Sequence, residues 1–328
     1  MTDANGPETT AQRNREDDLD PLSVDDAARA SNSVIDNVEE VIVGHHEEIE
    51  HVLTAVLADG HVLVEDVPGV GKTMLARALS RSIDCSFNRV QFTPDLLPSD
   101  VTGVNVFNQK TREFEFQRGP VFANLVLTDE INRAPPKTQS ALLEAMEEGQ
   151  VTVDGKTRPL PDPFTVVATQ NTVEQNRTYE LPLAEVDRFM KKINLGYPDH
   201  EEETTMLDRV VGGHPIDDLS AVTDVQTVRR ARATVSGVTV NGPIREYGSR
   251  LAGYTRENAA LGVSPRGTIA LLRAAQARAV LGGRDYVIPD DVQAEAPSVL
   301  AHRVRTEGGT ARDGGRIVSE ALDNVSVE

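Results

Sequence analysis

Several residue types are scarce in this chain of 328 residues, and each scarcity narrows the possible function classes. The single cysteine, Cys85, excludes a disulfide within the chain. No apolar run approaches the ~20 residues of a membrane-spanning helix, and Met1–Asp20 lacks the apolar centre of a secretory signal. We therefore expect a cytoplasmic protein in which Cys85, near Ile83 and Phe87, is a small buried hydrophobic residue.

Basic residues are scarce as well. The chain has 33 of them against 52 acidic residues, which gives a net charge of −19, and only six are lysines. Such a surface resembles that of proteins from salt-loving microbes, because concentrated salt screens the repulsion between carboxylates. The acidic balance argues against a broad nucleic-acid surface, although a narrow basic pore in an assembly would be compatible with it.

Two kinds of pattern divide the chain. Residues 1–30 are polar and acidic, and we expect a disordered tail there. Helical spacing at Ser33–Val43 and Glu47–Leu57 is followed by short apolar runs that are typical of buried strands. Past residue 198 only helical spacing remains. We therefore predict an α/β domain over residues 31–198 and an α-helical domain over residues 199–328.

Shorter signals refine this division. Alternating residues on either side of a turn predict two hairpins, Val104–Phe116 and Val151–Leu160. Ser264-Pro265 is a strong helix start, with a capping serine and a proline in the first turn. The helical patterns after residue 198 cover 201–211, 224–235, 244–256, 265–281 and 289–304.

The clearest functional signal is the glycine-rich segment Pro68-Gly69-Val70-Gly71-Lys72-Thr73. It follows the apolar run His61–Val64 and precedes the helical pattern Met74–Leu79. Glycines let such a loop turn its backbone N–H groups toward a phosphate, and the following helix points its positive end at the same anion. Lys72 would bind the β- and γ-phosphates, and Thr73 would bind Mg²⁺.

One position departs from the usual G-x-x-x-x-G-K-[ST] pattern, since Asp66 stands where the first glycine is expected. The alternative interpretation is a chance glycine turn followed by a lysine. The strand pattern before the loop and the helical pattern after it favour a phosphate-binding loop.

A second part of the candidate site follows the apolar run Asn124–Thr128. That run ends in Asp129-Glu130, where Asp129 would hold Mg²⁺ and Glu130 would polarise the attacking water. The alternative is an acidic turn at a strand end, which the apolar run and the upstream Lys72 make less favoured. Asn171, after the next strand pattern, would orient the same water or would be a simple turn residue.

Four segments together resemble the MoxR family of AAA+ ATPases, which belongs to the helix-2-insert clade. They are Glu65–Thr73, Gln91–Asp100, Thr128–Gln139 and Leu183–Phe189. The resemblance runs from about residue 33 to beyond residue 300, and Asp66 lies in a segment that is similar to this family's own form of the loop.

The resemblance implies a fold and a set of site residues. The fold is a doubly wound parallel-sheet P-loop core with a C-terminal all-α lid. The first hairpin would be inserted in helix 2, and the second would precede sensor 1. Asn171 would be sensor 1, Arg188 the arginine finger and Arg266 sensor 2. The nucleotide would contact Val43, Gly44, Pro68, Gly69, Val70, Gly71, Lys72, Thr73 and Met74.

Two of these assignments have plain alternatives in the sequence. Arg188 would pair locally with Asp187 or Glu185, and Arg266 would simply be an exposed residue. Arg133 is a further candidate for a contact with a neighbouring subunit.

The resemblance also implies a function. It points to an ATP-hydrolysing, Mg²⁺-dependent hexameric ring that remodels a client protein, commonly one with a von Willebrand factor A domain. Three alternatives stay open: a magnesium-chelatase-like motor subunit, a DNA motor of the same clade, and a scaffold that hydrolyses ATP poorly. The acidic surface argues against the DNA motor, and the presence of Glu130 and Arg188 argues against the scaffold.

Overall fold

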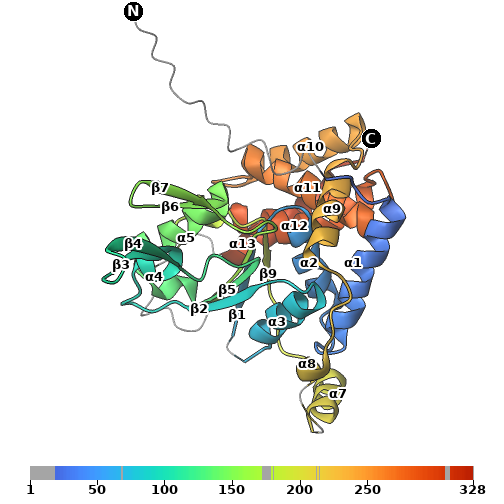
Figure 1. The fold of residues 1–328 in the computed structure, drawn as a ribbon. Helices are drawn as coiled ribbons and strands as arrows, with labels where there is room; N and C mark the ends of the chain where they lie inside the picture. Colours follow the sequence, from blue (N-terminus) through green and yellow to red (C-terminus); the bar gives the residue numbers. More distant parts are fainter. Residues whose placement is uncertain are drawn as a thin grey trace, which may run out of the picture.

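The computed structural model describes residues 19–67, 69–171, 179, 181–211, 213, 215–306 and 311–327. A parallel sheet with two hairpins lies on one side of the molecule, and most of the helices lie on the other (Figure 1). In the part of the chain covered by these ranges, no helix is long and apolar enough to cross a membrane.

The central sheet has five parallel strands in the order β2-β5-β8-β1-β9. The strands are β1 (Val62–Asp66), β2 (Phe87–Gln91), β5 (Leu125–Asp129), β8 (Thr165–Asn171) and β9 (Lys191–Ile193). Because the strands are parallel, their carboxyl ends meet at one edge of the sheet. This edge collects the glycine-rich loop, the Asp129-Glu130 pair and Asn171, as is usual in doubly wound folds.

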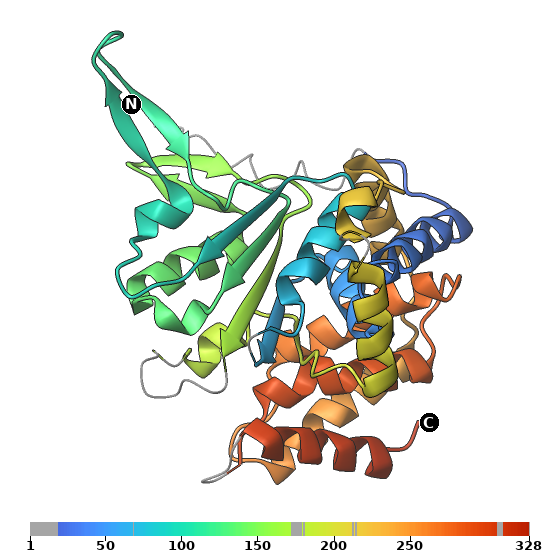
Figure 2. The ribbon, with the colours of Figure 1, turned by 90° about the horizontal axis from the view of Figure 1, so that it is seen from below.

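Alternate residues of the strands pack on opposite faces of this sheet. Val62 and Val64 of β1 belong to a hydrophobic cluster with α2 (His46–Leu57) and α3 (Lys72–Ser82), whereas Leu63 packs in a second cluster with α5 (Pro136–Glu148). Helices therefore cover both faces (Figure 2). This arrangement confirms the expected doubly wound core.

Both predicted hairpins are present. The first pairs β3 (Gly103–Asn108) with β4 (Glu113–Arg118) after the short α4 (Pro98–Thr102), and it projects from the body of the molecule (Figure 2). The second pairs β6 (Gln150–Val153) with β7 (Lys156–Pro159). Gly103 closes the base of the first hairpin: its φ is +97°, and a Cβ there would lie 2.4 Å from the carbonyl oxygen of Gln117.

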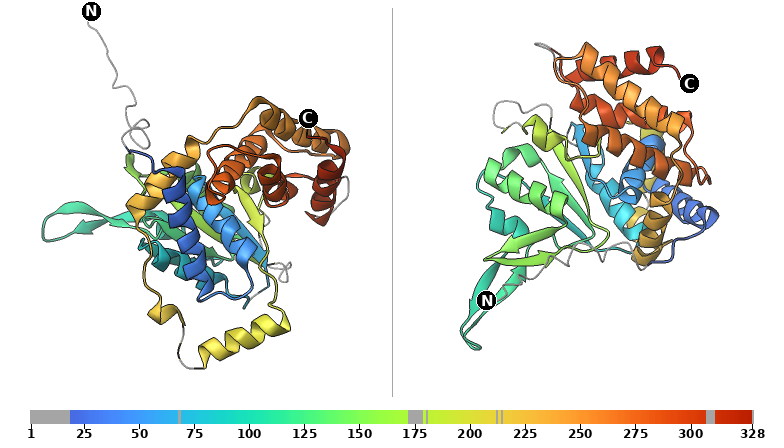
Figure 3. Two further views of the ribbon diagram at one scale, coloured as in Figure 1. Left: turned by 90° about the vertical axis from the view of Figure 1, so that its right-hand side faces the viewer. Right: turned by 90° about the horizontal axis from the view of Figure 1, so that it is seen from above.

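The second half of the chain is helical, as expected. Its helices are α7 (His200–Val210), α8 (Pro215–Asp218), α9 (Val225–Ser236), α10 (Gly242–Asn258), α11 (Pro265–Leu281), α12 (Pro289–Leu300), the 3₁₀ helix η3 (Ala301–Arg303) and α13 (Ala311–Asn324). The sequence patterns did not predict α8 or α13. One hydrophobic cluster contains residues from α1–α3 and from α9–α13, whereas α7 lies at the periphery (Figure 3). The domain boundary at residue 198 stays a prediction.

The amino-terminal prediction was wrong in part. Residues 24–30 were expected to belong to a disordered tail, but α1 (Val24–Glu39) begins there, and the Ser23 hydroxyl caps it by accepting the N–H of Asp26 at 3.1 Å. The first turns bury small residues, Ala27, Ala28 and Ser31, so the apolar signal on this face is weak. Residues 1–18 lie outside the described residues.

Candidate nucleotide-binding and catalytic site

The glycine-rich loop joins β1 to α3 at the carboxyl edge of the sheet. Gly69 has φ +92° and Gly71 has φ +91°, and both conformations favour glycine. A Cβ at either position would meet nothing within 4 Å, so backbone conformation, and not crowding, requires these glycines. Gly71 is also the N-cap of α3, so the loop ends where the helix offers free N–H groups to an anion. Pro68 lies outside the described residues.

The Lys72 side chain contacts the start of this loop. Its Nζ donates a hydrogen bond to the carbonyl oxygen of Val67 at 2.6 Å. Burial lowers the pKa of Lys72, and the carboxylates of Asp66, Asp129 and Glu130 oppose that shift. Three carboxylates therefore favour the ammonium form of Lys72, which is the form that would bind a phosphate.

Asp66 explains why the usual first glycine is absent. Its buried carboxylate accepts hydrogen bonds from the backbone N–H groups of Val67, Leu195 and Gly196, each at 2.7 Å. The side chain thus ties the start of the loop to the segment that follows β9. A glycine could not make these bonds, so Asp66 has a structural role here.

The two acidic residues after β5 are both engaged by polar side chains. The Asp129 carboxylate lies 2.5 Å from Nε of Arg89 and accepts a hydrogen bond from the Thr169 hydroxyl at 3.3 Å. The Glu130 carboxylate accepts hydrogen bonds from Nε2 of Gln91 at 3.0 Å and from Arg133 at 2.6 Å. Glu130 itself has φ +57°, an uncommon conformation for a residue with a Cβ, and such strain is frequent at functional sites.

A cavity of about 310 Å³ brings the predicted phosphate and catalytic residues together. Its lining consists of Gly69, Gly71, Lys72, Thr73, Met74, Arg89, Gln91, Asp129, Glu130, Thr169 and Asn171. The Thr73 hydroxyl and the Asp129 carboxylate are oxygen ligands of the kind that Mg²⁺ takes when substrate phosphates supply the rest. Among the residues that the structure describes, no group of three or more His, Cys, Asp or Glu side chains could hold a metal ion alone.

A second cavity, of about 390 Å³, adjoins the first across the same loop. Gly69, Gly71 and Met74 line both cavities. The second one adds residues that suit an apolar base: Val41, Ile42, Val43, Val70, Tyr197, Pro198 and Met206, together with polar groups such as Arg209. Gly44, predicted with Val43 to contact adenine, lies beside this lining, and a Cβ there would collide with the Glu202 carboxylate at 2.1 Å.

Arg188 and Arg266 line neither cavity. Arg188 follows α6 (Leu183–Val186) and precedes β9 by three residues, so it lies at the amino edge of the sheet, opposite the loop. There both arginines share one carboxylate: Glu147 lies 3.2 Å from Arg188 and 2.5 Å from Arg266. The alternative in which Arg188 pairs with Asp187 or Glu185 is not what the structure shows.

Known proteins resemble the chain over both its sheet and its lid. Residues 61–191 match the family model described as the ATPase family associated with various cellular activities (AAA), and residues 251–321 match the AAA lid domain. The chain is 41% identical to the chaperone MoxR1 of Mycobacterium tuberculosis over 81% of this chain and 73% of that protein. It belongs to the MoxR family of AAA+ ATPases.

Two further similar proteins match more of the chain. YeaC of Bacillus subtilis is 52% identical over 88% of each protein. A crystal structure of a candidate ATPase from Cytophaga hutchinsonii superposes with a TM-score of 0.84 at 38% identity, covering 93% of this chain and 97% of that one. Membership of an ATPase family implies that the chain binds and hydrolyses ATP.

Several residues of this MoxR-family site were not predicted from the sequence. Arg89 and Gln91 lie on β2 and reach Asp129 and Glu130 because β2 and β5 are adjacent, with Gln91 in register with Asp129. The order of strands in the sheet follows from long-range pairing, so a local pattern could not place them. The polar residues at alternate positions of 87–91 were the one available signal.

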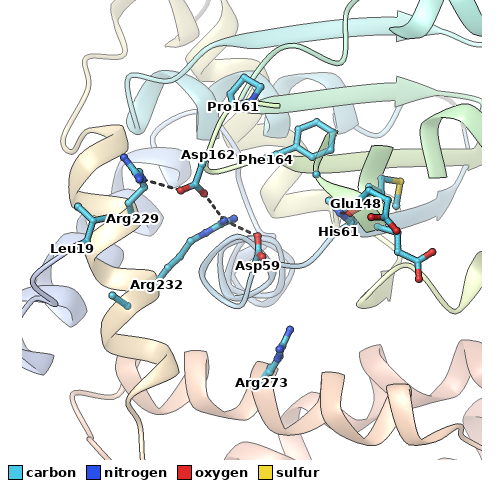
Figure 4. Close-up of a pocket in the computed structure, with 14 residues that line it drawn as sticks. Leu19, Asp59, His61, Glu148, Pro161, Asp162, Phe164, Arg229, Arg232 and Arg273 are labelled. Carbon is cyan, nitrogen blue, oxygen red and sulfur yellow. Dashed lines mark hydrogen bonds and ion pairs between the residues drawn. The ribbon is translucent and has the colours of Figure 1, made fainter. Parts of the chain in front are cut away.

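Another cleft of the MoxR-family fold lies at the amino edge, beside Glu147 (Figure 4). Two of its three arginines pair with carboxylates: Arg229 with Asp162 at 2.9 Å, and Arg232 with Asp59 at 2.8 Å. Because most of its positive charge is compensated in this way, the cleft is a poor candidate for the nucleotide site.

Proposed function

We propose that this chain is a Mg²⁺-dependent ATPase whose active sites form between the subunits of a ring, and that the ring acts as a chaperone on a client protein. The observation that carries the proposal is the separation of two sets of residues. The loop and Glu130 lie at the carboxyl edge of the sheet, whereas Arg188 and Arg266 share Glu147 at the amino edge.

The carboxyl-edge set would bind the nucleotide and activate water. The loop N–H groups and Lys72 contact the phosphates, and Thr73 and Asp129 hold the metal. Bound Mg²⁺ neutralises charge on the β- and γ-phosphate oxygens. Glu130 is the general base. It must leave Arg133 and Gln91 to accept a proton from the attacking water, with Asn171 orienting that water.

The amino-edge set would complete the site of a neighbour. The five residues of β1 span about 16 Å, which separates Arg188 from the loop of its own chain. In a ring, the guanidinium groups of Arg188 and Arg266 would leave Glu147 and face the γ-phosphate of the next subunit. A guanidinium in that position stabilises the charge of the transition state.

The proposed chaperone activity on a client protein is based on similar proteins. MoxR1 is named a chaperone, and we extend that activity to this chain. A client with a von Willebrand factor A domain, and a ring of six subunits, rest on the family resemblance of the sequence motifs.

Mixing two inactive variants tests the shared site. Arg188→Ala should bind ATP but hydrolyse it at least ~10³-fold more slowly, and Lys72→Ala should not bind ATP. Mixed rings should regain activity, because an intact loop then meets an intact Arg188. The measurement is steady-state ATPase activity over a mixing series, with assembly followed by sedimentation.

The control for this series is Arg316→Ala, which removes an exposed arginine of α13 that pairs with Glu320 at 3.1 Å. It should keep wild-type activity at every mixing ratio. If mixed rings form and activity stays at zero, Arg188 does not act across a subunit interface.

A separate substitution tests the base. Glu130→Gln should keep ATP affinity and lose hydrolysis, because the carboxylate is needed only where a proton leaves the water. Binding of a fluorescent ATP analogue and phosphate release measure the two properties. Hydrolysis at the wild-type rate would remove Glu130 from the mechanism.

A further inference from the structure

The turn that carries Arg188 is held by a residue far along the chain. Arg303, at the end of η3, is buried, with only 3% of its side chain exposed. Its Nε donates to the Asp187 carboxylate at 2.7 Å, and its Nη2 donates to the carbonyl oxygens of Asp187 at 3.0 Å and Phe189 at 2.8 Å. Its Nη1 donates to the carbonyl of Met190 at 3.1 Å and to that of Val299.

Most of the hydrogen bonds from Arg303 go to one short segment, residues 187–190. A guanidinium has five N–H donors in a fixed plane, and those of Arg303 reach the residues on both sides of Arg188. Because the fork is rigid and buried, it fixes the path of the backbone from residue 187 to residue 190. The Arg188 guanidinium pairs with Glu147, so its position depends on the backbone from which it extends.

A cluster formed by Asp187, Ser264 and Arg303 also supports the start of α11, which carries Arg266. The other oxygen of the Asp187 carboxylate accepts the Ser264 hydroxyl at 3.3 Å, and the Ser264 hydroxyl oxygen caps α11 by accepting the N–H of Gly267 at 3.2 Å. Gly267 lies against Arg303 so closely that a Cβ there would be 2.7 Å from its Cδ. In the sequence, Arg266 lies between the N-cap Ser264 and Gly267.

We infer that Arg303 is a positioning residue, which through Asp187 and Ser264 fixes the spacing between Arg188 and Arg266. The inference rests on the proposed function, in which both arginines act on a neighbour's nucleotide. Their spacing already fits one anion, since they contact the two oxygens of the Glu147 carboxylate at 3.2 and 2.5 Å. Loss of the cluster would leave both arginines present but misplaced.

Arg303→Lys and Ser264→Ala test this inference. Lysine keeps the charge but cannot form the fork, and alanine removes the link to Asp187. A misplacement of about 1 Å costs on the order of 100-fold in rate, so kcat should fall about 10- to 100-fold in each variant. KM should change less than about twofold, because the nucleotide-binding residues are untouched.

Two variants separate positioning from general stability. Ser264→Thr keeps the hydroxyl and should restore kcat. Asn241→Ala removes the matching N-cap of α10, where the side chain accepts the N–H of Ile244 at 3.1 Å and, among the described residues, makes no hydrogen bond to Asp187 or Arg303. It should lower the melting temperature as Ser264→Ala does, with kcat unchanged. If Asn241→Ala lowers kcat equally, the effect is loss of stability and the inference fails.

Mixing with Lys72→Ala identifies which half of the site is damaged. Arg303→Lys and Ser264→Ala should both be rescued by Lys72→Ala, as Arg188→Ala is. If Arg188→Ala is rescued and the two cluster variants are not, the proposed function stands and the inference about Arg303 is overturned. If none of the three variants is rescued, the proposal that subunits share an active site is wrong. Should Arg303→Lys fail to fold, Ser264→Ala alone decides.

Discussion

Asp66 shows how a single residue can alter a motif without removing its function. Sequence patterns identify it only as a missing glycine, because they describe the loop and not its surroundings. In the structure its carboxylate accepts hydrogen bonds from the N–H groups of Leu195 and Gly196, which lie more than 120 residues away in the sequence. The Asp66 side chain thus joins the loop to the segment that follows β9.

This tie predicts the result of restoring the motif. Asp66→Gly should destabilise the protein and weaken nucleotide binding, because the N–H groups of Leu195 and Gly196 lose a charged acceptor worth ~1.5–3 kcal/mol each. Urea denaturation and titration with a fluorescent nucleotide measure the two effects. Asp66→Asn, which keeps one acceptor oxygen, should fall between wild type and glycine. A glycine variant as stable as wild type would show that the tie contributes nothing.

At this scale the sequence was informative wherever the chemistry is local. Gly69, Gly71, Lys72 and Thr73 are contiguous, and their order alone carries the phosphate-binding chemistry. Arg89 could not be predicted, because its contact with Asp129 depends on which strand pairs with β5.

Among the elements, a buried histidine joins three that are distant in sequence. Nε2 of His61, just before β1, hydrogen bonds to the carbonyl oxygen of Met146 in α5 at 3.0 Å, and Nδ1 accepts the N–H of Val166 in β8 at 3.0 Å. Because Nδ1 accepts, the ring must be neutral. Burial lowers the pKa of His61, and the hydrogen bond that its Nε2 donates to the carbonyl oxygen of Met146 opposes the shift.

Stability should therefore fall on mild acidification. The unfolded chain binds a proton below about pH 6.5, whereas the folded chain resists it, so the contribution of His61 is present above that pH and lost below it. Burial and the Arg303 charge also lower the pKa of His302, so it adds to the same trend. The slope should approach ~1.4 kcal/mol per pH unit for each histidine. Denaturant unfolding at pH 7.5 and 5.5 measures it.

The control is a histidine with the opposite shift. A hydrogen bond to the Glu39 carboxylate raises the pKa of the exposed His46, so His46→Gln should not flatten the pH dependence. His61→Gln should flatten it. An unchanged slope in His61→Gln would mean that His61 titrates equally in the folded and unfolded chain.

Element boundaries were predicted best where apolar spacing was strong. α11 begins at Pro265 and ends at Leu281, as predicted, because Ser264 and Pro265 mark its start. α1 began earlier than predicted because small residues such as Ala27 pack inward and leave little apolar signal. The start of α11 was therefore predictable from its cap, whereas the start of α1 was hidden by the small size of the side chains that it buries.

For the molecule as a whole, the net charge bears on the proposed assembly. With −19 on each chain, subunits approach against repulsion, and salt weakens that repulsion. We predict that assembly with a non-hydrolysable ATP analogue strengthens as KCl rises from dilute to molar concentration. Sedimentation velocity measures this. Sucrose at matched osmolality, which screens no charge, should not reproduce the effect, and a ring most stable in dilute buffer would contradict the prediction.

The glycine-rich loop lies at one edge of the sheet, and Arg188 and Arg266 lie at the opposite edge. The two halves of the proposed site are therefore on opposite sides of each subunit. In the proposed assembly such chains would associate head to tail, and head-to-tail contacts either close into a ring or continue as a filament. Each nucleotide would then contact the arginines of the neighbour on one side only. An open arc would lack one complete site, and a single chain would have none. The rate per chain should consequently fall toward zero on dilution, which makes hydrolysis a reporter of closure.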